Sequence, residues 1–99
     1  MATIDSQRNI VKKISGDLRA MSHPLRLKII QLIKRNGSIN VNRIYRALDM
    51  EQSMTSQHLR VLRQHGIVDA KRDGKMIYYS VNEARIHEIM KQSVDFIFA

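Results

Sequence analysis

Residues 53 to 66 contain a short polar and cationic pattern that is well suited to binding a ligand. Ser53 favours the N-cap of a helix, Gly66 favours the position just after its end, and neither Pro nor Gly lies between them. Leu59 and Leu62 fall on one side of this helix. The other side carries hydrogen-bonding and charged groups, namely Ser53, Ser56, Gln57, Arg60 and Gln64. Such a helix is short enough to enter a groove of nucleic acid, although an ordinary solvated helix face has the same pattern.

The overall charge favours nucleic acid. The chain has 99 residues, enough for one small domain, with a formal net charge of +8 and a pI near 10.3. A positive surplus on so small a domain attracts phosphate or anionic lipid and makes binding sensitive to salt. Hydrophobic residues make up 43% and charged residues 26%, which is typical of a soluble globular protein. Nucleic acid is therefore the leading class of partner.

The sequence contains neither cysteine nor a long apolar segment. Without cysteine there can be no disulfide, no thiolate metal site and no thiol redox sensing. No segment approaches the roughly 20 apolar residues that span a bilayer, and the N-terminus lacks the pattern of a signal peptide. We therefore expect a cytoplasmic protein with no membrane partner.

Three predicted helices precede residue 53. The first spans about 5 to 20, and the second begins with Ser22 as its cap and Pro24 in its first turn. Asn40 or Asn42 can cap the third, which is short. Two short helices joined by so few residues predict a helix-turn-helix over about 40 to 66, whose second helix enters the DNA major groove.

The segment after Gly66 has the pattern of a hairpin with a cationic tip. Asp73-Gly74 lies between two β-rich runs, and Lys71, Arg72 and Lys75 flank this turn. The hairpin, over about 67 to 81, can act as a wing on a phosphate backbone or in a minor groove. A last apolar helix over about 83 to 98 follows it. Residues 1 to 99 are thus predicted to form a single winged-helix domain, mainly α with one small β-hairpin, in the order ααααββα.

Three sequence segments resemble the ArsR/SmtB transcriptional repressors, which are dimeric winged-helix proteins of bacteria and archaea. The first is His23-Pro24-Leu25-Arg26 with Ile29-Ile30. The second is Ser56-Gln57-His58-Leu59 with Leu62 and Gly66-Ile67-Val68, and the third is Arg72-Asp73-Gly74-Lys75 with Tyr78-Tyr79. The resemblance runs from about 17 to 98, with the segments in the expected order and spacing.

This resemblance implies a homodimeric repressor that presents two recognition helices to a palindromic operator and is nucleoid-associated when bound. Its first and last helices would form the dimer interface, through Ile10, Val11, Ile14, Leu18, Ile86, Ile89, Met90, Val94 and Ile97. Ser56, Gln57 and Arg60 would reach base edges or adjacent phosphates, since Gln can pair with adenine and Arg with guanine. The other expected DNA-binding residues, mainly phosphate contacts or supports, are Arg43, Ser53, Thr55, His58, Arg63, Lys71, Arg72 and Lys75.

The sequence departs from the family at its metal-sensing positions. The thiolate pair that some members carry falls here on Asn40 and Asn42, and the last-helix zinc ligands fall on Glu83, Arg85, Phe96 and Ala99. A cation, a ring and a methyl group cannot form a zinc shell. We therefore predict no metal and no cofactor, and the signal that relieves repression is left open.

Other interpretations of the sequence are weaker. Four histidines, at 23, 58, 65 and 87, contain no pair spaced i, i+4, so a metal shell would have to assemble across chains. Glu83, His87 and Glu88 lack the nucleophile and orienting groups of an enzyme, and we predict none. A protein-interaction module with weak DNA binding is the alternative. It is disfavoured because the cations concentrate in the helix-turn-helix and wing, whereas residues 81 to 99 hold three acids against two bases.

Overall fold

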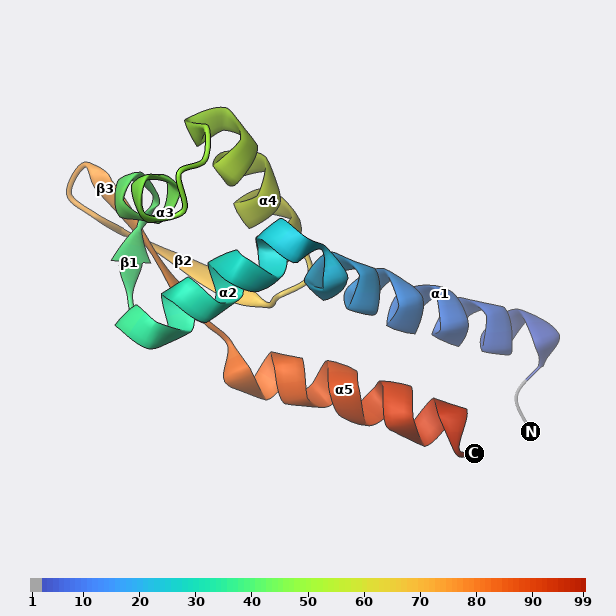
Figure 1. The fold of residues 1–99 in the computed structure, drawn as a ribbon. Coiled ribbons are helices and arrows are strands. Elements are labelled where there is room, and N and C mark those ends of the chain that lie inside the picture. Colours follow the sequence, from blue (N-terminus) through green and yellow to red (C-terminus); the bar gives the residue numbers. More distant parts are fainter. Residues whose placement is uncertain (1–2) are drawn as a thin grey trace.

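The computed structural model describes residues 3–99 and confirms a mainly α winged helix (Figure 1). This part of the chain forms five helices and one small antiparallel sheet with strand order β1-β3-β2. The elements, in order, are α1 (Ile4–Ser22), α2 (Pro24–Asn36), β1 (Ile39–Asn40), α3 (Val41–Ala47), α4 (Gln52–Gln64), β2 (Val68–Asp73), β3 (Met76–Val81) and α5 (Glu83–Ile97).

The short strand β1 is an addition to the predicted element order. Its two residues pair with β3, Ile39 opposite Tyr79 and Asn40 opposite Tyr78. Both β1 residues are buried. This pairing attaches the middle of β3 to the start of α3, so the wing and the helix-turn-helix are held together.

Side-chain caps define the starts of several helices. Asn40, rather than Asn42, caps α3 by accepting a hydrogen bond from the Arg43 backbone N–H at 2.9 Å. Asn82 accepts from the Arg85 N–H at 3.1 Å at the start of α5. The predicted Ser22 cap of α2 is wrong, because Ser22 ends α1.

His23 takes the place of that cap. It separates α1 from α2, and its Nδ1 accepts from the Leu25 N–H at 3.1 Å. Pro24 occupies the first turn of α2, where its missing N–H has no intrahelical partner to lose.

The predicted start of α4 also shifts. The helix begins at Gln52 and its N-cap residue is Glu51, which makes no side-chain cap hydrogen bond, so Ser53 lies inside the first turn. Gly66, with φ of 73°, ends the helix as predicted, since a positive φ favours glycine. Ser53 is therefore a surface residue of the helix rather than its cap.

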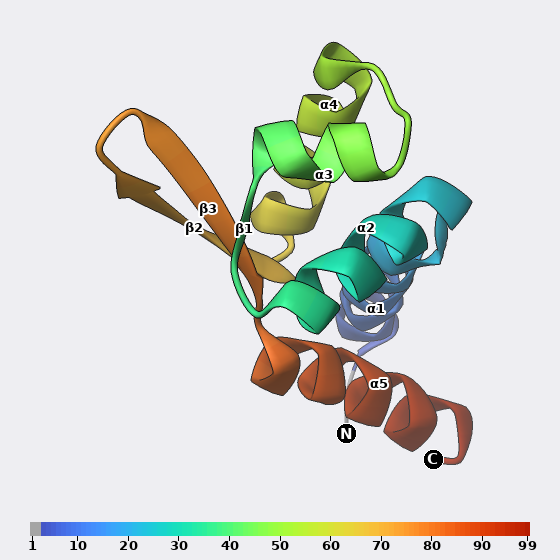
Figure 2. The same ribbon diagram turned by 60° about the vertical axis from the view of Figure 1, so that its left-hand side comes forward.

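The wing turns one residue later than predicted. Asp73 pairs with Met76, which leaves Gly74 and Lys75 as the two loop residues. Figure 2 shows the β2–β3 hairpin projecting from the helices. Only Gly74 has a positive φ, 62°, which is the requirement of a II′ turn at its first position. The shift leaves Lys75 at the tip of the hairpin.

The core lies beneath the helix-turn-helix. Its fully buried members come from α2, α3, α4, β2, α5 and the α4–β2 connection, and they are Ile29, Ile33, Ile44, Leu59, Leu62, Ile67, Val68 and Ile89. Helices α1 and α5 contact each other and extend away from this body (Figure 1). None of the helices in residues 3–99 has the length and apolar character to cross a membrane.

Candidate nucleic-acid interface

Helix α4 presents a continuous polar face to solvent. Its exposed side chains recur at three- and four-residue spacing and are those of Ser53, Ser56, Gln57, Arg60 and Arg63. Leu59 and Leu62, on the opposite side, are buried. The structure thus brings together the predicted base-reading residues on one face of a 13-residue helix.

Thr55 is a correction to the predicted set. Its side chain is fully buried, with 0% exposure, and its hydroxyl donates to the Glu51 carbonyl at 2.9 Å. Since it lies on the Leu59 and Leu62 side of α4, it cannot reach a phosphate. The helical spacing predicted the right face for its neighbours, but Thr55 belongs to the core.

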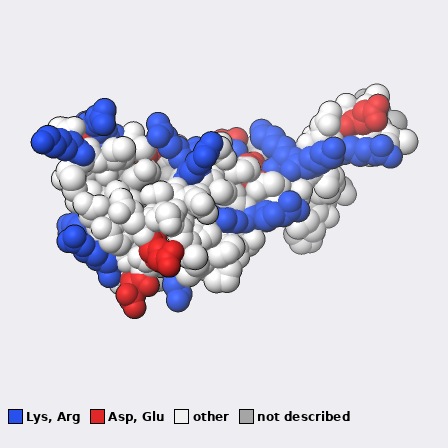
Figure 3. Space-filling model, turned by 90° about the horizontal axis from the view of Figure 1, so that it is seen from above, with Lys and Arg blue, Asp and Glu red and all other residues white. Residues whose placement is uncertain are grey.

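The remaining predicted cations lie on α3, which packs against α4, and on the wing. Arg43 on α3 and Lys71, Arg72 and Lys75 on the wing are exposed. In Figure 3, Lys and Arg side chains lie along the face seen from above, from the end that holds the wing to the end formed by α1. The exposed polar face of α4 therefore belongs to a positively charged side of the molecule.

His58 faces inward from α4 and packs against the start of α2. Its ring centroid lies 4.7 Å from that of His23, and its Nδ1 accepts from Arg26 Nη1 at 3.4 Å. Burial lowers the pKa of His58 below 6.5, and the neighbouring His23 and Arg26 lower it further. His58 is therefore a neutral support behind the exposed face of α4 at neutral pH.

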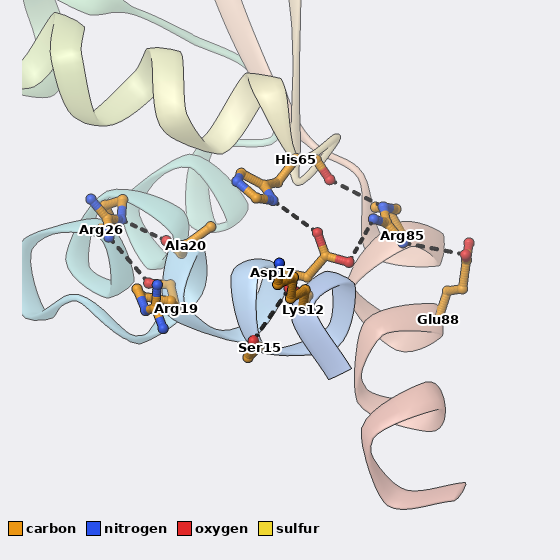
Figure 4. Close-up of polar contacts among 9 residues, drawn as sticks. All are labelled: Lys12, Ser15, Asp17, Arg19, Ala20, Arg26, His65, Arg85 and Glu88. Atoms are coloured by element: carbon orange, nitrogen blue, oxygen red, sulfur yellow. Dashed lines mark hydrogen bonds and ion pairs between the residues drawn. The ribbon is translucent and has the colours of Figure 1, made fainter. Parts of the chain in front are cut away.

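Arg26 joins this cluster to the end of α1. Its Nε donates to the Ala20 carbonyl at 2.6 Å, and its Nη2 donates to the Arg19 carbonyl at 3.1 Å (Figure 4). These carbonyls lie in the last turn of α1, where backbone acceptors lack intrahelical partners. One guanidinium thus holds the C-terminal turn of α1, and its third nitrogen bonds to α4.

A second polar cluster joins three helices through one buried carboxylate (Figure 4). Asp17 on α1 is 4% exposed. Its Oδ1 accepts from His65 Nδ1 at 2.8 Å, and its Oδ2 accepts from Arg85 Nη2 at 3.0 Å. Arg85 also donates from Nε to the His65 carbonyl at 3.1 Å and from Nη1 to Glu88 at 3.2 Å. We call Asp17, His65 and Arg85 the carboxylate hub.

Sequence reasoning missed this hub, although one signal was present. Asp17 falls in the helical stripe of Ile10, Ile14 and Met21, and a carboxylate on an apolar stripe requires a buried partner. Its partners are 48 and 68 residues away along the chain, so their identity was not evident from local spacing.

The predicted dimer residues divide into two groups. The exposed group comprises Ile10, Val11, Met90, Val94 and Ile97. The group that is partly buried within the chain comprises Ile14, Leu18 and Ile86. Ile89 is a correction: it is 1% exposed and belongs to the core of its own chain. Further exposed apolar residues extend the surface on α1, α2 and α5, namely Ile4, Leu27, Phe96 and Phe98.

An apolar groove lies beside this surface. It is lined by Leu18, Met21, Leu27, Ile30, Ile86 and Met90, from α1, α2 and α5.

Within residues 3–99, no three His, Asp or Glu side chains lie together in a group that could hold a metal ion.

A helix-turn-helix with an exposed polar second helix and a basic wing defines a winged helix-turn-helix DNA-binding domain. Residues 23–70 match the family described as bacterial regulatory protein, arsR family. The chain is 38% identical over 74 residues to the transcriptional repressor PagR of Bacillus anthracis. The matched region covers 75% of this chain and 74% of PagR. The chain therefore belongs to the arsR family of transcriptional regulators, which are DNA-binding proteins and not enzymes.

Two solved structures have the same fold. NolR from Sinorhizobium fredii has a TM-score of 0.77 at 26% identity, over 97% of this chain and 94% of that one. A homodimeric winged helix-turn-helix domain from Mycobacterium bovis has a TM-score of 0.76 at 24% identity, over 95% and 87%. The ArsR resemblance inferred from the sequence is thus confirmed.

We predict that Asp17→Asn lowers the free energy of unfolding by about 3 kcal/mol, because it leaves the Arg85 guanidinium without its buried counter-charge. Urea denaturation at one protein concentration measures the decrease. Glu88→Gln is the control, since Glu88 touches the same guanidinium from the exposed side and its removal should cost less than about 1 kcal/mol. Equal decreases in the two variants would contradict the role assigned to Asp17.

A second prediction concerns pH. Because the folded pKa of His58 is lowered, the unfolded chain takes up more protons, and this residue's contribution to stability is lost as the pH falls below 6.5 towards the folded pKa. His58→Gln should therefore flatten the pH dependence of the denaturation midpoint between about pH 7.5 and about pH 5.5. Gln64→Ala, at an exposed position of the same helix that carries no titrating group, is the control and should keep the wild-type profile. An unchanged profile in His58→Gln would contradict the prediction.

Proposed function

We propose that this chain is a homodimeric repressor that binds a palindromic operator, with α4 in the major groove of each half-site and the wing on the adjacent backbone or minor groove. The polar, exposed face of α4 beside a basic wing is the observation that carries this proposal. Its site of action is the cytoplasm of a bacterium or archaeon, where the bound form is associated with the nucleoid. The relative PagR is described as a repressor, which supports the direction of regulation.

The DNA-binding residues have separate roles. Ser56, Gln57 and Arg60 read base edges, because they lie on the exposed polar face of α4 and an amide or guanidinium can form paired hydrogen bonds with a base. The remaining exposed DNA-binding residues hold phosphates and set the register of the helix, namely Arg43, Ser53, Arg63, Lys71, Arg72 and Lys75. His58 acts from behind through its contacts with α2.

Dimerisation follows from the unpartnered apolar surface of α1 and α5. Val94 is 50% exposed and Ile97 is 70% exposed, and they lie on the same helix as Met90, at 48%. An apolar surface this extensive on a small chain favours association, and a two-fold dimer presents two copies of α4 to two half-sites about one turn of DNA apart.

Selection of bound duplexes from a random pool tests the function directly. We expect a sequence with two inverted half-sites. Enrichment of no sequence, together with weak binding to all DNA, would instead support a winged-helix module that serves a protein partner.

With the selected duplex, Gln57→Ala should weaken binding by about 1 to 3 kcal/mol and relax sequence preference, because alanine cannot form hydrogen bonds with a base edge. Arg72→Ala should weaken binding to all duplexes about equally and lower the salt dependence, because one fewer phosphate is neutralised. Titration against selected and scrambled duplexes at two salt concentrations separates these effects. If Gln57→Ala weakened both duplexes equally, Gln57 would not read a base.

For the dimer, we predict that Val94→Asp produces a monomer at micromolar concentration, because it places a charge in the apolar interface. Sedimentation velocity measures the change. Ile77→Asp introduces the same charge at an exposed apolar position of the wing and should remain dimeric. A monomeric wild-type chain, or a dimeric Val94→Asp variant, would count against this interface.

A further inference from the structure

Helix α1 carries a row of cations that have no assigned role in the fold and are not among the proposed DNA-binding residues. Arg8, Lys12 and Arg19 are exposed and lie four and seven residues apart, which places them on one side of the helix. Asp17, Ala20 and Met21, which are buried, lie on the opposite side. We call Arg8, Lys12 and Arg19 the α1 cation row. Its length is about 16 Å at 1.5 Å per residue.

These cations are unpaired within residues 3–99, where no salt bridge involves Arg8, Lys12 or Arg19. The acids of α5 are in the opposite situation. Glu83 pairs with Lys34, Glu88 with Arg85, and Asp95 with Lys91. A second copy of the chain would therefore approach α1 with an α5 whose acids already have partners, so the row has no evident counter-charge in a dimer.

The row begins beside the recognition helix. Arg26 bonds both to the Arg19 carbonyl and to His58 of α4, which places the last turn of α1 next to α4. From there α1 extends away from the winged-helix body (Figure 1). Seen from above, blue side chains continue over this extension on the same face that α4 occupies (Figure 3). The row thus extends the positive surface of α4 along α1.

We propose that the α1 cation row is a second DNA-binding surface, which contacts backbone phosphates of the operator segment between the two half-sites. This inference rests on the proposed function, because only a dimer through α1 and α5 places α1 between the two copies of α4. Half-sites about 34 Å apart leave a central segment that neither recognition helix fills, and DNA that spans both must pass over α1. Unpaired guanidinium and ammonium groups attract its phosphates and release their counterions.

The test compares the triple variant Arg8→Gln, Lys12→Gln, Arg19→Gln with wild type on the duplex selected by wild type. Glutamine keeps helix propensity and length while it removes the charge. The slope of log K against log salt concentration should become shallower by about 0.9 for each phosphate that is no longer neutralised, and by about 5 if all six cations of a dimer are engaged. Phosphate-ethylation interference should disappear between the half-sites and persist within them.

Arg35→Gln is the control, since it removes an exposed cation that takes part in no ion pair within residues 3–99. Arg35 lies in the last turn of α2, the end of that helix that points away from α4 (Figure 1). The salt slope and interference pattern of this control should match those of wild type. If the triple variant keeps the wild-type salt slope and the interference between the half-sites, the α1 cation row does not bind DNA. The proposed function would still stand in that case, provided that the wild-type chain selects a duplex with two half-sites. If the triple variant becomes a monomer in sedimentation, the row contacts the second copy instead, and the proposal is wrong. If wild type selects no duplex, the proposed function itself fails.

Discussion

The orientation of the recognition helix depends on one buried carboxylate. Asp17 accepts a hydrogen bond from His65 at the end of α4 and another from Arg85 on α5, while its own backbone belongs to α1. Burying a charge is costly unless it is paired and hydrogen-bonded, and both carboxylate oxygens here have a donor. The geometry that satisfies this carboxylate requires α1, α4 and α5 to meet in one arrangement. An apolar contact of the same size would tolerate sliding, whereas hydrogen bonds of 2.8 and 3.0 Å would not.

The second attachment of α4, through His58, makes this constraint useful for reading DNA. His65 follows the last turn of α4 and is held by Asp17, while His58, near the middle of the helix, contacts His23 and Arg26. Two attachments on the inner side fix both the position and the direction of a helix whose outer side is polar. Since α1 and α5 also carry the exposed apolar surface, the same contacts relate each recognition helix to the proposed two-fold axis. In the proposed dimer, the distance between the two recognition helices is then set by packing inside each chain as well as by the interface.

Local chemistry made most of the fold predictable from the sequence, and non-local pairing limited the rest. Asn40, Asn82, Pro24 and Gly66 act on their own helices, so their effects could be inferred from neighbouring residues. The strand β1 has only two residues and exists because β3 pairs with it, which no local pattern signals. Thr55 and Ile89 were misassigned because helical spacing defines a face but not what lies against it. For the site, spacing predicted the exposed residues of α4, whereas the hub that holds α4 required contacts across 48 and 68 residues.

The distribution of ion pairs explains how a chain of net charge +8 can fold and still keep cations available for DNA. The acids of α5 and the buried Asp17 are paired within the chain, so these attractions stabilise the fold and cannot serve a ligand. The cations of α4, the wing and the outer side of α1 lack such partners within residues 3–99 and repel one another. That repulsion disfavours the compact state until phosphates neutralise it. Binding to DNA thus relieves a repulsion present in the free protein, and by linkage it also stabilises the folded chain.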